Sequence, residues 1–231
     1  MTAQQRLDQT LEAIDRATQE SGRKASSVTL MAVSKTHPYQ EILDLFDCSQ
    51  RLFGENRVQE VEQKFPLVRP AGMKVHLIGH LQSNKVSKIV PLVDGIDSVD
   101  SLKIARRISS SCVEMGRRMP VLLQYNTSEE DAKSGFEHEG DLYAALDALD
   151  GLPGITVQGL MTIGPLGGGE KETRTAFALL RELQMSCIAR YPHLDLSTLS
   201  MGMSGDFPLA IREGATMVRV GTSLFGKRQM Q

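Results

Sequence analysis

The sequence lacks tryptophan altogether and contains only three cysteines among its 231 residues. Cys48, Cys112 and Cys187 lie far apart, and none belongs to a C-x-x-C pair or to a cluster with histidine. An odd and scattered set of cysteines argues against a disulfide framework and against a structural zinc site. Such a set is typical of reduced thiols in the cytosol, so we expect a cytoplasmic protein without a bound metal.

Long apolar runs and an excess of charge of one sign are also missing. No segment approaches the roughly 18 consecutive apolar residues that a membrane-spanning helix requires. The first twenty residues have neither the basic start nor the apolar stretch of a secretory signal. The 26 basic and 28 acidic side chains give a net charge of −2, which supplies no basic field for a polyanion. We therefore expect no association with a membrane and no binding of nucleic acid.

What the sequence does contain is a regular alternation of two patterns. Residues 2–20 place Leu7, Leu11, Ile14 and Ala17 at the spacing of a helix with one buried face. After this helix, short β-branched or apolar runs alternate with longer amphipathic stretches, which is typical of βαβ units and a parallel sheet. The eight predicted strands cover residues 28–33, 51–53, 75–78, 95–99, 121–125, 155–161, 198–201 and 217–220.

Eight such units in about 200 residues predict a (β/α)8 barrel. Barrels of about 200–250 residues often form one domain, and no linker or shift in composition marks a domain boundary here. The alternative is a doubly wound open sheet, which normally carries a G-x-G-x-x-G turn after its first strand. The first predicted strand ends instead in Ser34, Lys35 and Thr36. We therefore predict an α/β protein with a single TIM barrel over about residues 28–227, preceded by the helix at 2–20.

A lysine directly follows the first predicted strand. In a (β/α)8 barrel, reactive groups collect at the carboxyl ends of the strands. Partial burial there would favour the neutral form of the Lys35 amine, and a neutral amine can attack an aldehyde to form a Schiff base. The same position also fits a lysine whose long side chain simply reaches solvent at a strand end.

The last two predicted strands both end in small and hydroxyl-bearing residues. Ser200 and Ser204 lie at the end of the seventh strand, and Gly221 and Thr222 follow the eighth. Barrels often bind phosphate with these two loops, where backbone N–H groups, hydroxyls and a helix N-terminus converge. Taken separately, each loop is better explained as an ordinary helix cap. Together they predict a phosphate site, and with Lys35 they point to a phosphorylated aldehyde, pyridoxal 5′-phosphate (PLP).

Arg219 lies inside the eighth predicted strand, between Val218 and Val220, so its side chain points away from theirs. An inward-facing Arg219 needs an acceptor, because a buried and unpaired guanidinium is costly. The pyridine nitrogen of PLP could accept from it, which would keep that nitrogen unprotonated and make the cofactor a poor electron sink. An outward-facing Arg219 paired with a helix carboxylate such as Glu213 fits the spacing equally well.

Further polar residues near the strand ends give weaker signals. His37, His76 and His80 have no metal-ligand spacing, and we expect them to be structural. Asp97 and Asp100, near the end of the fourth predicted strand, fit a carboxylate pair as well as they fit loop and helix-cap positions.

Seven short motifs stand out along the chain. They are AVSKT at 32–36, FGEN at 53–56 followed by VQE at 58–60, IGHLQ at 78–82, KSG at 133–135, GLM at 159–161, SMGMS at 200–204 and VRVGT at 218–222. In this order and at this spacing, they resemble the motifs of the pyridoxal phosphate homeostasis protein family. The resemblance covers about residues 5–227.

This resemblance implies a fold-type III PLP-binding barrel, similar to the N-terminal domain of alanine racemase. It implies that Lys35 holds PLP as a Schiff base, that Arg219 faces the pyridine nitrogen, and that Asn56 lies near the ring. The residues that it implies for the phosphate are Ser200, Ser204, Gly221 and Thr222.

The sequence departs from the family pattern at three positions. Arg57 and Val75 replace residues that are often aromatic in the family, which predicts a less aromatic lining on that side of the pocket. Gly205 replaces an acidic residue before Asp206, and we expect this change to leave the backbone of the phosphate loop intact.

The resemblance implies a PLP carrier that balances vitamin B6 and amino-acid pools, without an established reaction. The alternative is a PLP-dependent amino-acid racemase of the alanine racemase type, which needs a second base on the opposite face of the cofactor. In alanine racemases a tyrosine from a second domain supplies that base, and this sequence ends at Gln231, soon after the eighth predicted strand. Of its four tyrosines, only Tyr125 lies near a strand end. We therefore expect a monomeric carrier without evident turnover, whose partners are PLP and, through PLP, the apo-enzymes that use it.

Overall fold

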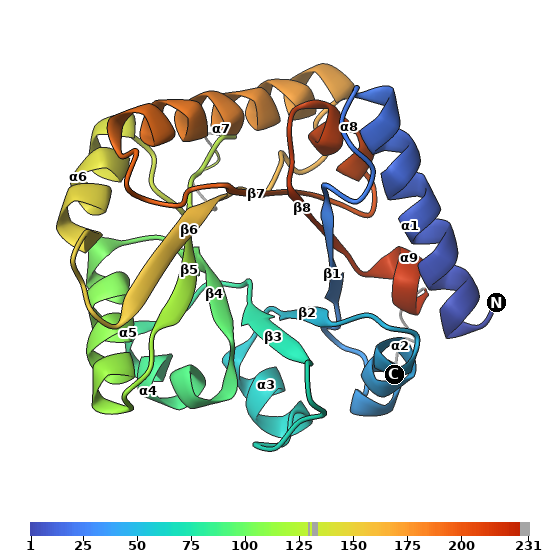
Figure 1. The fold of residues 1–231 in the computed structure, drawn as a ribbon, viewed down its shortest axis with the longest axis horizontal. Helices are drawn as coiled ribbons and strands as arrows, with labels where there is room; N and C mark the ends of the chain where they lie inside the picture. Colours follow the sequence, from blue (N-terminus) through green and yellow to red (C-terminus); the bar gives the residue numbers. More distant parts are fainter. Residues whose placement is uncertain (129, 131–133, 227–231) are drawn as a thin grey trace.

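The computed structural model describes residues 1–128, 130 and 134–226. Within these ranges, eight parallel strands close into a barrel in which each strand pairs with its sequence neighbours and β1 pairs with β8 (Figure 1). This arrangement confirms the predicted TIM barrel, and the open-sheet alternative is wrong. The strands are β1 (Thr29–Val33), β2 (Leu52–Glu55), β3 (Lys74–Leu77), β4 (Gly95–Val99), β5 (Met119–Gln124), β6 (Ile155–Met161), β7 (Thr198–Met203) and β8 (Met217–Val220).

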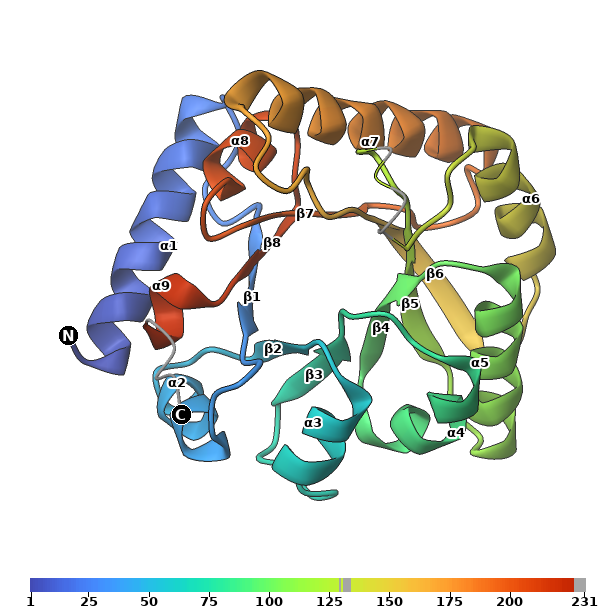
Figure 2. The ribbon, with the colours of Figure 1, turned by 180° about the vertical axis from the view of Figure 1, so that it is seen from behind.

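Helices form an outer ring around the barrel in both views (Figures 1 and 2). The α-helices are α1 (Ala3–Glu20), α2 (Tyr39–Asp47), α3 (Val58–Lys64), α4 (Val86–Ile89), α5 (Leu102–Glu114), α6 (Glu139–Leu149), α7 (Glu170–Arg190), α8 (Phe207–Arg212) and α9 (Thr222–Phe225). Two 3-10 turns, η1 (Ser83–Lys85) and η2 (Val90–Leu92), flank α4. In the described ranges, no helix combines the length and the apolar character that crossing a bilayer demands.

The helix α1 confirms the predicted N-terminal helix and closes the ring beside α8 and α9 (Figure 1). It begins after Thr2, whose hydroxyl accepts from the Gln5 N–H at 3.2 Å while the Gln5 side chain accepts from the Thr2 N–H at 3.0 Å. Arg6 Nε donates to the carbonyl of Leu224 in α9 at 2.5 Å. The first helix is thereby bonded to the segment that follows β8.

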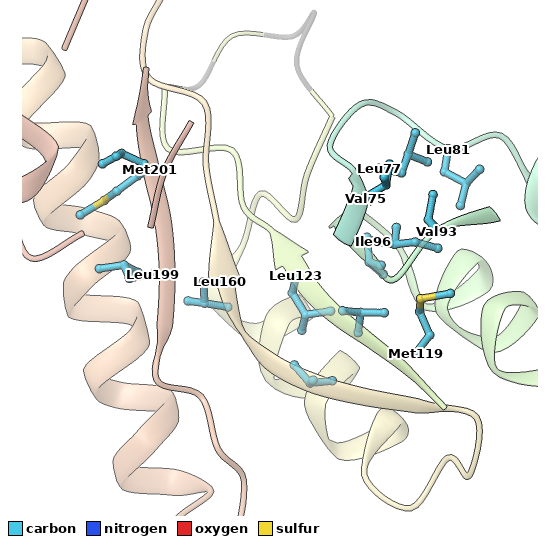
Figure 3. Packing of buried hydrophobic residues seen from close by; sticks show 14 of the residues in the cluster. Val75, Leu77, Leu81, Val93, Ile96, Met119, Leu123, Leu160, Leu199 and Met201 are labelled. Atoms are coloured by element: carbon cyan, nitrogen blue, oxygen red, sulfur yellow. The ribbon is translucent and has the colours of Figure 1, made fainter. Parts of the chain in front are cut away.

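Alternation along the strands divides their side chains between two packing regions. Outward side chains such as Leu77 and Leu123 are fully buried between the barrel and the helices (Figure 3). Burial of a leucine contributes about 1.5–3 kcal/mol, so this layer supplies the main driving force for folding. On the inner side of β1, Met31 and Val33 pack with Ile78 in a separate small cluster. The inner and outer sets therefore follow the strand period of two.

Candidate functional site

Lys35 lies in the turn directly after β1, and it is half-buried. Along β1, Met31 and Val33 pack inside the barrel. Ser34 belongs to the outer side, because its hydroxyl donates to the outward carboxylate of Glu55 at 2.7 Å. The period-two alternation therefore directs Lys35 inward, at the carboxyl-terminal mouth of the barrel.

Asn56 is the neighbour of Lys35 on the rim. The β1–β2 register pairs Val33 with Gly54, and each of the two residues lies two positions further along its strand. The backbone of Asn56 is closely packed, since a Cβ atom on Gly79 would lie 2.1 Å from the Asn56 carbonyl oxygen. A glycine at position 79 is therefore needed for the loop after β3 to approach Asn56.

Arg219 faces the interior of the barrel and is only 4% exposed. Its Nη1 donates to Ser200 Oγ at 2.8 Å, and its Nη2 donates to the carbonyl of Thr162 at 2.7 Å. Burial lowers the pKa of Arg219 to about 10, against the opposing attraction of the Asp97 and Asp206 carboxylates. The guanidinium therefore remains charged at neutral pH and can act only as a donor.

The alternative position for Arg219, outside the barrel beside Glu213, is wrong. The Glu213 carboxylate accepts instead from Arg174 Nε at 2.8 Å and from Arg181 Nη1 at 2.6 Å. Both of those arginines belong to α7, which packs against α8. The inward position of Arg219 follows from the strand alternation that also buries its neighbours in β8.

The loops after β7 and β8 meet at the same mouth. The Gly221 N–H donates to Ser204 Oγ at 3.2 Å, which joins the two loops directly. Gly221 also lies close to β1, because a Cβ atom added there would be 3.0 Å from the carbonyl oxygen of Val33. Thr222, the next residue, is exposed as α9 begins.

The turn that carries Lys35 contacts the segment after β8. The His37 ring stacks on the Phe225 ring of α9, with centroids 4.6 Å apart. His37 Nδ1 is 2.8 Å from Glu41 Oε2, which fixes the plane of the imidazole. The lysine turn and the second predicted phosphate loop are therefore packed against each other.

Neither Ser200 nor Asp206 takes part in the Ser204–Gly221 bond that joins the two loops. The Ser200 hydroxyl is fully buried on Arg219, below the rim, and its assignment to the phosphate stays a prediction. Asp206 precedes α8, and its Oδ1 accepts from the Met203 N–H at 2.5 Å. That bond fixes the turn around Ser204 from within the same loop.

A second buried polar pair lies inside the barrel, on strands β3 and β4. His76 Nδ1 is 2.9 Å from Asp97 Oδ1. Burial disfavours the charged form of His76, but the attraction and hydrogen bond of Asp97 outweigh it and raise the pKa of the imidazole. Of the two interpretations left open for Asp97 and Asp100, the carboxylate pair is not supported, because Asp100 bonds instead to His80, whose Nδ1 lies 2.8 Å away. Sequence reasoning missed the His76–Asp97 pair because no local pattern joins residues 21 positions apart.

No metal site emerges from the part of the chain that the structure describes, where no three His, Cys, Asp or Glu side chains are grouped to hold an ion.

Tyr125, the tyrosine nearest a strand end, points away from the mouth. Its side chain belongs to the outer core, and its hydroxyl donates to the carbonyl of Glu137 at 2.9 Å.

The three departures from the family pattern lie in different surroundings. Arg57 is exposed at the start of α3, and Gly205 is exposed in the loop after β7. Val75 is fully buried in the outer core (Figure 3). The expectation that Val75 lines the pocket is wrong, because the alternation of β3 turns its side chain toward the helices.

Comparison with known proteins decides the family. The model of the alanine racemase N-terminal domain family matches residues 9–229. A pyridoxal phosphate homeostasis protein of Vibrio cholerae is 41% identical over 229 residues, which cover 97% of this chain and 96% of that protein. This chain belongs to the pyridoxal phosphate homeostasis protein family.

Solved structures agree with that membership. PipY of Synechococcus elongatus PCC7942, solved with PLP bound, is 40% identical, covers 93% of this chain and 100% of its own, and has a TM-score of 0.79. An alanine racemase of Clostridium difficile is 16% identical, with a TM-score of 0.69 over 95% of this chain and 56% of its own. At that identity the racemase shares the barrel fold alone.

Of the family motifs quoted above, the KSG motif begins at Lys133, which lies outside the described residues.

Proposed function

We propose that this homeostasis-family protein binds PLP at the carboxyl-terminal mouth of its barrel and holds it as a Schiff base on Lys35. In this role it contributes to the balance of PLP and amino acids without catalytic turnover. One observation carries the proposal: the turn bearing Lys35, the inward Arg219 and the joined loops of Ser204 and Gly221 converge at one mouth. The PLP bound to PipY, a family member, supports the same assignment.

The joined loops fit a phosphate group. Gly221 and Ser204 already hydrogen-bond to each other, so an N–H donor and a hydroxyl are within reach of one shared acceptor. Thr222 adds a second hydroxyl beside them, at the start of α9. Backbone N–H groups and hydroxyls of this kind are suited to a phosphate dianion. Ser200 lies within β7, below the rim, and would contribute through its bond to Arg219.

Lys35 would hold the cofactor through its amine. The neutral amine adds to the aldehyde carbon, a C=N bond forms and one water molecule leaves. When bound, PLP supplies an electrophilic carbonyl and an aromatic ring that can take up electron density. Asn56, beside Lys35 on the rim, would orient the ring.

Arg219 would donate to the pyridine nitrogen of the ring. Its guanidinium already donates to Ser200 and to Thr162, and it has further N–H groups available for another acceptor. Because its pKa stays near 10, Arg219 has no proton to give the ring at neutral pH. An unprotonated ring is a weak electron sink, which favours holding over carbanion chemistry.

The partners and setting follow from this function. A protein that holds PLP in an exchangeable bond would act on PLP-dependent apo-enzymes through the free cofactor. We propose that it does so as a monomer in the cytoplasm, where Cys112 and Cys187, which are buried and free, would remain reduced.

The phosphate site is tested by comparing PLP with pyridoxal, which lacks the phosphate. We expect pyridoxal to bind about 100-fold or more weakly, because several charge-assisted hydrogen bonds are lost. Thr222→Ala should weaken PLP binding by about 10–100-fold, since it removes one such bond of about 1.5–3 kcal/mol. The position of the Schiff-base absorption band should not change. The measurement is an absorbance titration of the purified protein.

Thr175→Ala is the matched control, because Thr175 is an exposed threonine on α7. It should bind PLP like the wild type. Equal affinity for PLP and pyridoxal, or unaltered retention of PLP by Thr222→Ala, would place the phosphate elsewhere.

The racemase alternative is tested by turnover. A racemase needs a second base, and the hydroxyl of Tyr125 is committed to the carbonyl of Glu137 in the outer core. We expect the PLP-loaded protein to interconvert the alanine enantiomers far below the rate of about 1 s⁻¹ that marks ordinary enzymes. A chiral chromatography assay over hours measures this rate. Turnover at or above that rate would establish the racemase instead.

A further inference from the structure

The turn that carries Lys35 is held from outside the barrel by a charged cluster. Three side chains form it, and we call them the α3 clamp: Glu55 at the end of β2, and Glu60 and Lys64 of α3. The clamp bonds to both sequence neighbours of Lys35, namely Ser34 before it and Thr36 after it.

On the Ser34 side, the contacts are buried. Glu55 Oε1 accepts from the Ser34 hydroxyl at 2.7 Å and from Lys64 Nζ at 2.6 Å. Lys64 Nζ also donates to the Ser34 carbonyl at 2.9 Å. The Glu55 side chain is fully buried, and the Lys64 side chain is 11% exposed. Removal of either charge would therefore leave its partner unpaired away from water.

On the Thr36 side, the clamp makes one bond to an unfavourable backbone, in a turn that the His37 N–H closes by donating to the Ser34 carbonyl at 3.1 Å. The Thr36 N–H donates to Glu60 Oε2 at 2.8 Å, and the same carboxylate oxygen lies 3.5 Å from Lys64 Nζ. Thr36 has a φ of 68°, in the left-handed region that a β-branched residue rarely adopts. The turn keeps this conformation only where surrounding bonds hold it.

We propose that Glu60 and Lys64 are positioning residues for Lys35: they lock the turn on both sides of it, so that its amine is presented to the PLP aldehyde in a fixed orientation. This inference rests on the proposed Schiff base. Neither residue contacts the mouth through any bond described above, because the clamp lies on the outer side of β1 and β2. Its effect therefore reaches the cofactor only through the backbone of residues 34–36.

The clamp should matter for covalent attachment more than for binding of the phosphate. A reacting pair depends steeply on orientation, and a misplacement of about 1 Å can cost about 100-fold in rate. The phosphate loops belong to β7 and β8 and, apart from the His37–Phe225 stack, are held by bonds that the clamp does not make. A relaxed lysine turn would leave those loops able to bind an anion.

Glu60→Ala tests this separation, because alanine preserves the helix and removes the acceptor of the Thr36 N–H. We expect the rate constant for Schiff-base formation with PLP, followed by stopped-flow absorbance, to fall by about tenfold or more. The affinity for pyridoxine 5′-phosphate, which has the phosphate but no aldehyde, should stay at the wild-type value. Glu60→Gln retains an oxygen acceptor and should recover most of the rate. Lys64→Met should lower the rate as well, provided that thermal unfolding shows a folded protein.

The control is Glu62→Ala, an exposed glutamate on the same helix, which should leave both measurements unchanged. A wild-type rate in Glu60→Ala would overturn the positioning role. So would a fall in pyridoxine 5′-phosphate affinity as large as the fall in rate, because the defect would then be general. A wild-type protein that binds PLP without forming any Schiff base would contradict the proposed function itself, which is a distinguishable result.

Discussion

Lys35→Ala is expected to abolish the Schiff-base absorption band of the protein in the presence of PLP, leaving only the absorption of the free aldehyde. The reason is that the Schiff base forms on this amine, and alanine offers none. PLP should still enter the mouth through the loops of Ser204 and Gly221, but it should exchange freely and be lost on gel filtration. The measurement is the absorbance spectrum before and after desalting. The fold should be unaffected, because Lys35 lies in a turn outside the strands.

Lys88→Ala is the matched control for this variant, since Lys88 is an exposed lysine of α4. It should keep the absorption band and retain PLP through desalting. An intact band in Lys35→Ala would show that another lysine carries the cofactor.

Arg219→Met should destabilise the protein itself by about 2–3 kcal/mol, even without PLP, because two buried acceptors lose their donor while the cost of burying the charge is also removed. Methionine keeps an unbranched side chain that covers the aliphatic part of arginine but cannot donate, so Ser200 Oγ and the Thr162 carbonyl lose this donor inside the barrel. Hydrogen bonds to a charged group contribute about 1.5–3 kcal/mol each, and here both are buried. Urea unfolding of the apo-protein measures the loss. PLP affinity should fall too, because the ring nitrogen loses its donor.

Arg212→Met provides the comparison for an exposed arginine. Arg212 Nη2 bonds to Glu20 at 3.2 Å, and 45% of its side chain is exposed. Solvent screens that pair, so its removal should cost about 1 kcal/mol or less. Equal destabilisation by the two substitutions would mean that the buried contacts of Arg219 contribute no more than a surface ion pair.

The sequence is sufficient to predict the barrel, because the barrel follows from local periodicity. Eight apolar runs separated by amphipathic stretches indicate the βα units, and alternation within β8 leaves Arg219 only two possible sides. The choice between them needed the structure. Only there does Glu213 have two arginines of α7 as partners, so that Arg219 is left to the interior.

Contacts between distant segments could not be predicted in this way. Ser34 and Lys64 are 30 residues apart, and nothing in either local pattern indicates that the ammonium reaches the carbonyl. The position of Ser200 shows the same limit, because a serine at a strand end fits the rim as well as the interior. The direction of Val75 was predictable from the alternation of its strand, and the family pattern led to the wrong expectation.

The amine of Lys35, at the barrel mouth, is expected to form a covalent bond with PLP. Borohydride reduces a C=N bond to a stable secondary amine, so the PLP-loaded protein can be reduced, digested and analysed by mass spectrometry. The phosphopyridoxyl mass should lie on the peptide that contains Lys35, with Lys64 unmodified. Labelling of another lysine, or no labelling of a protein that retains PLP, would contradict the assignment of the Schiff base to Lys35.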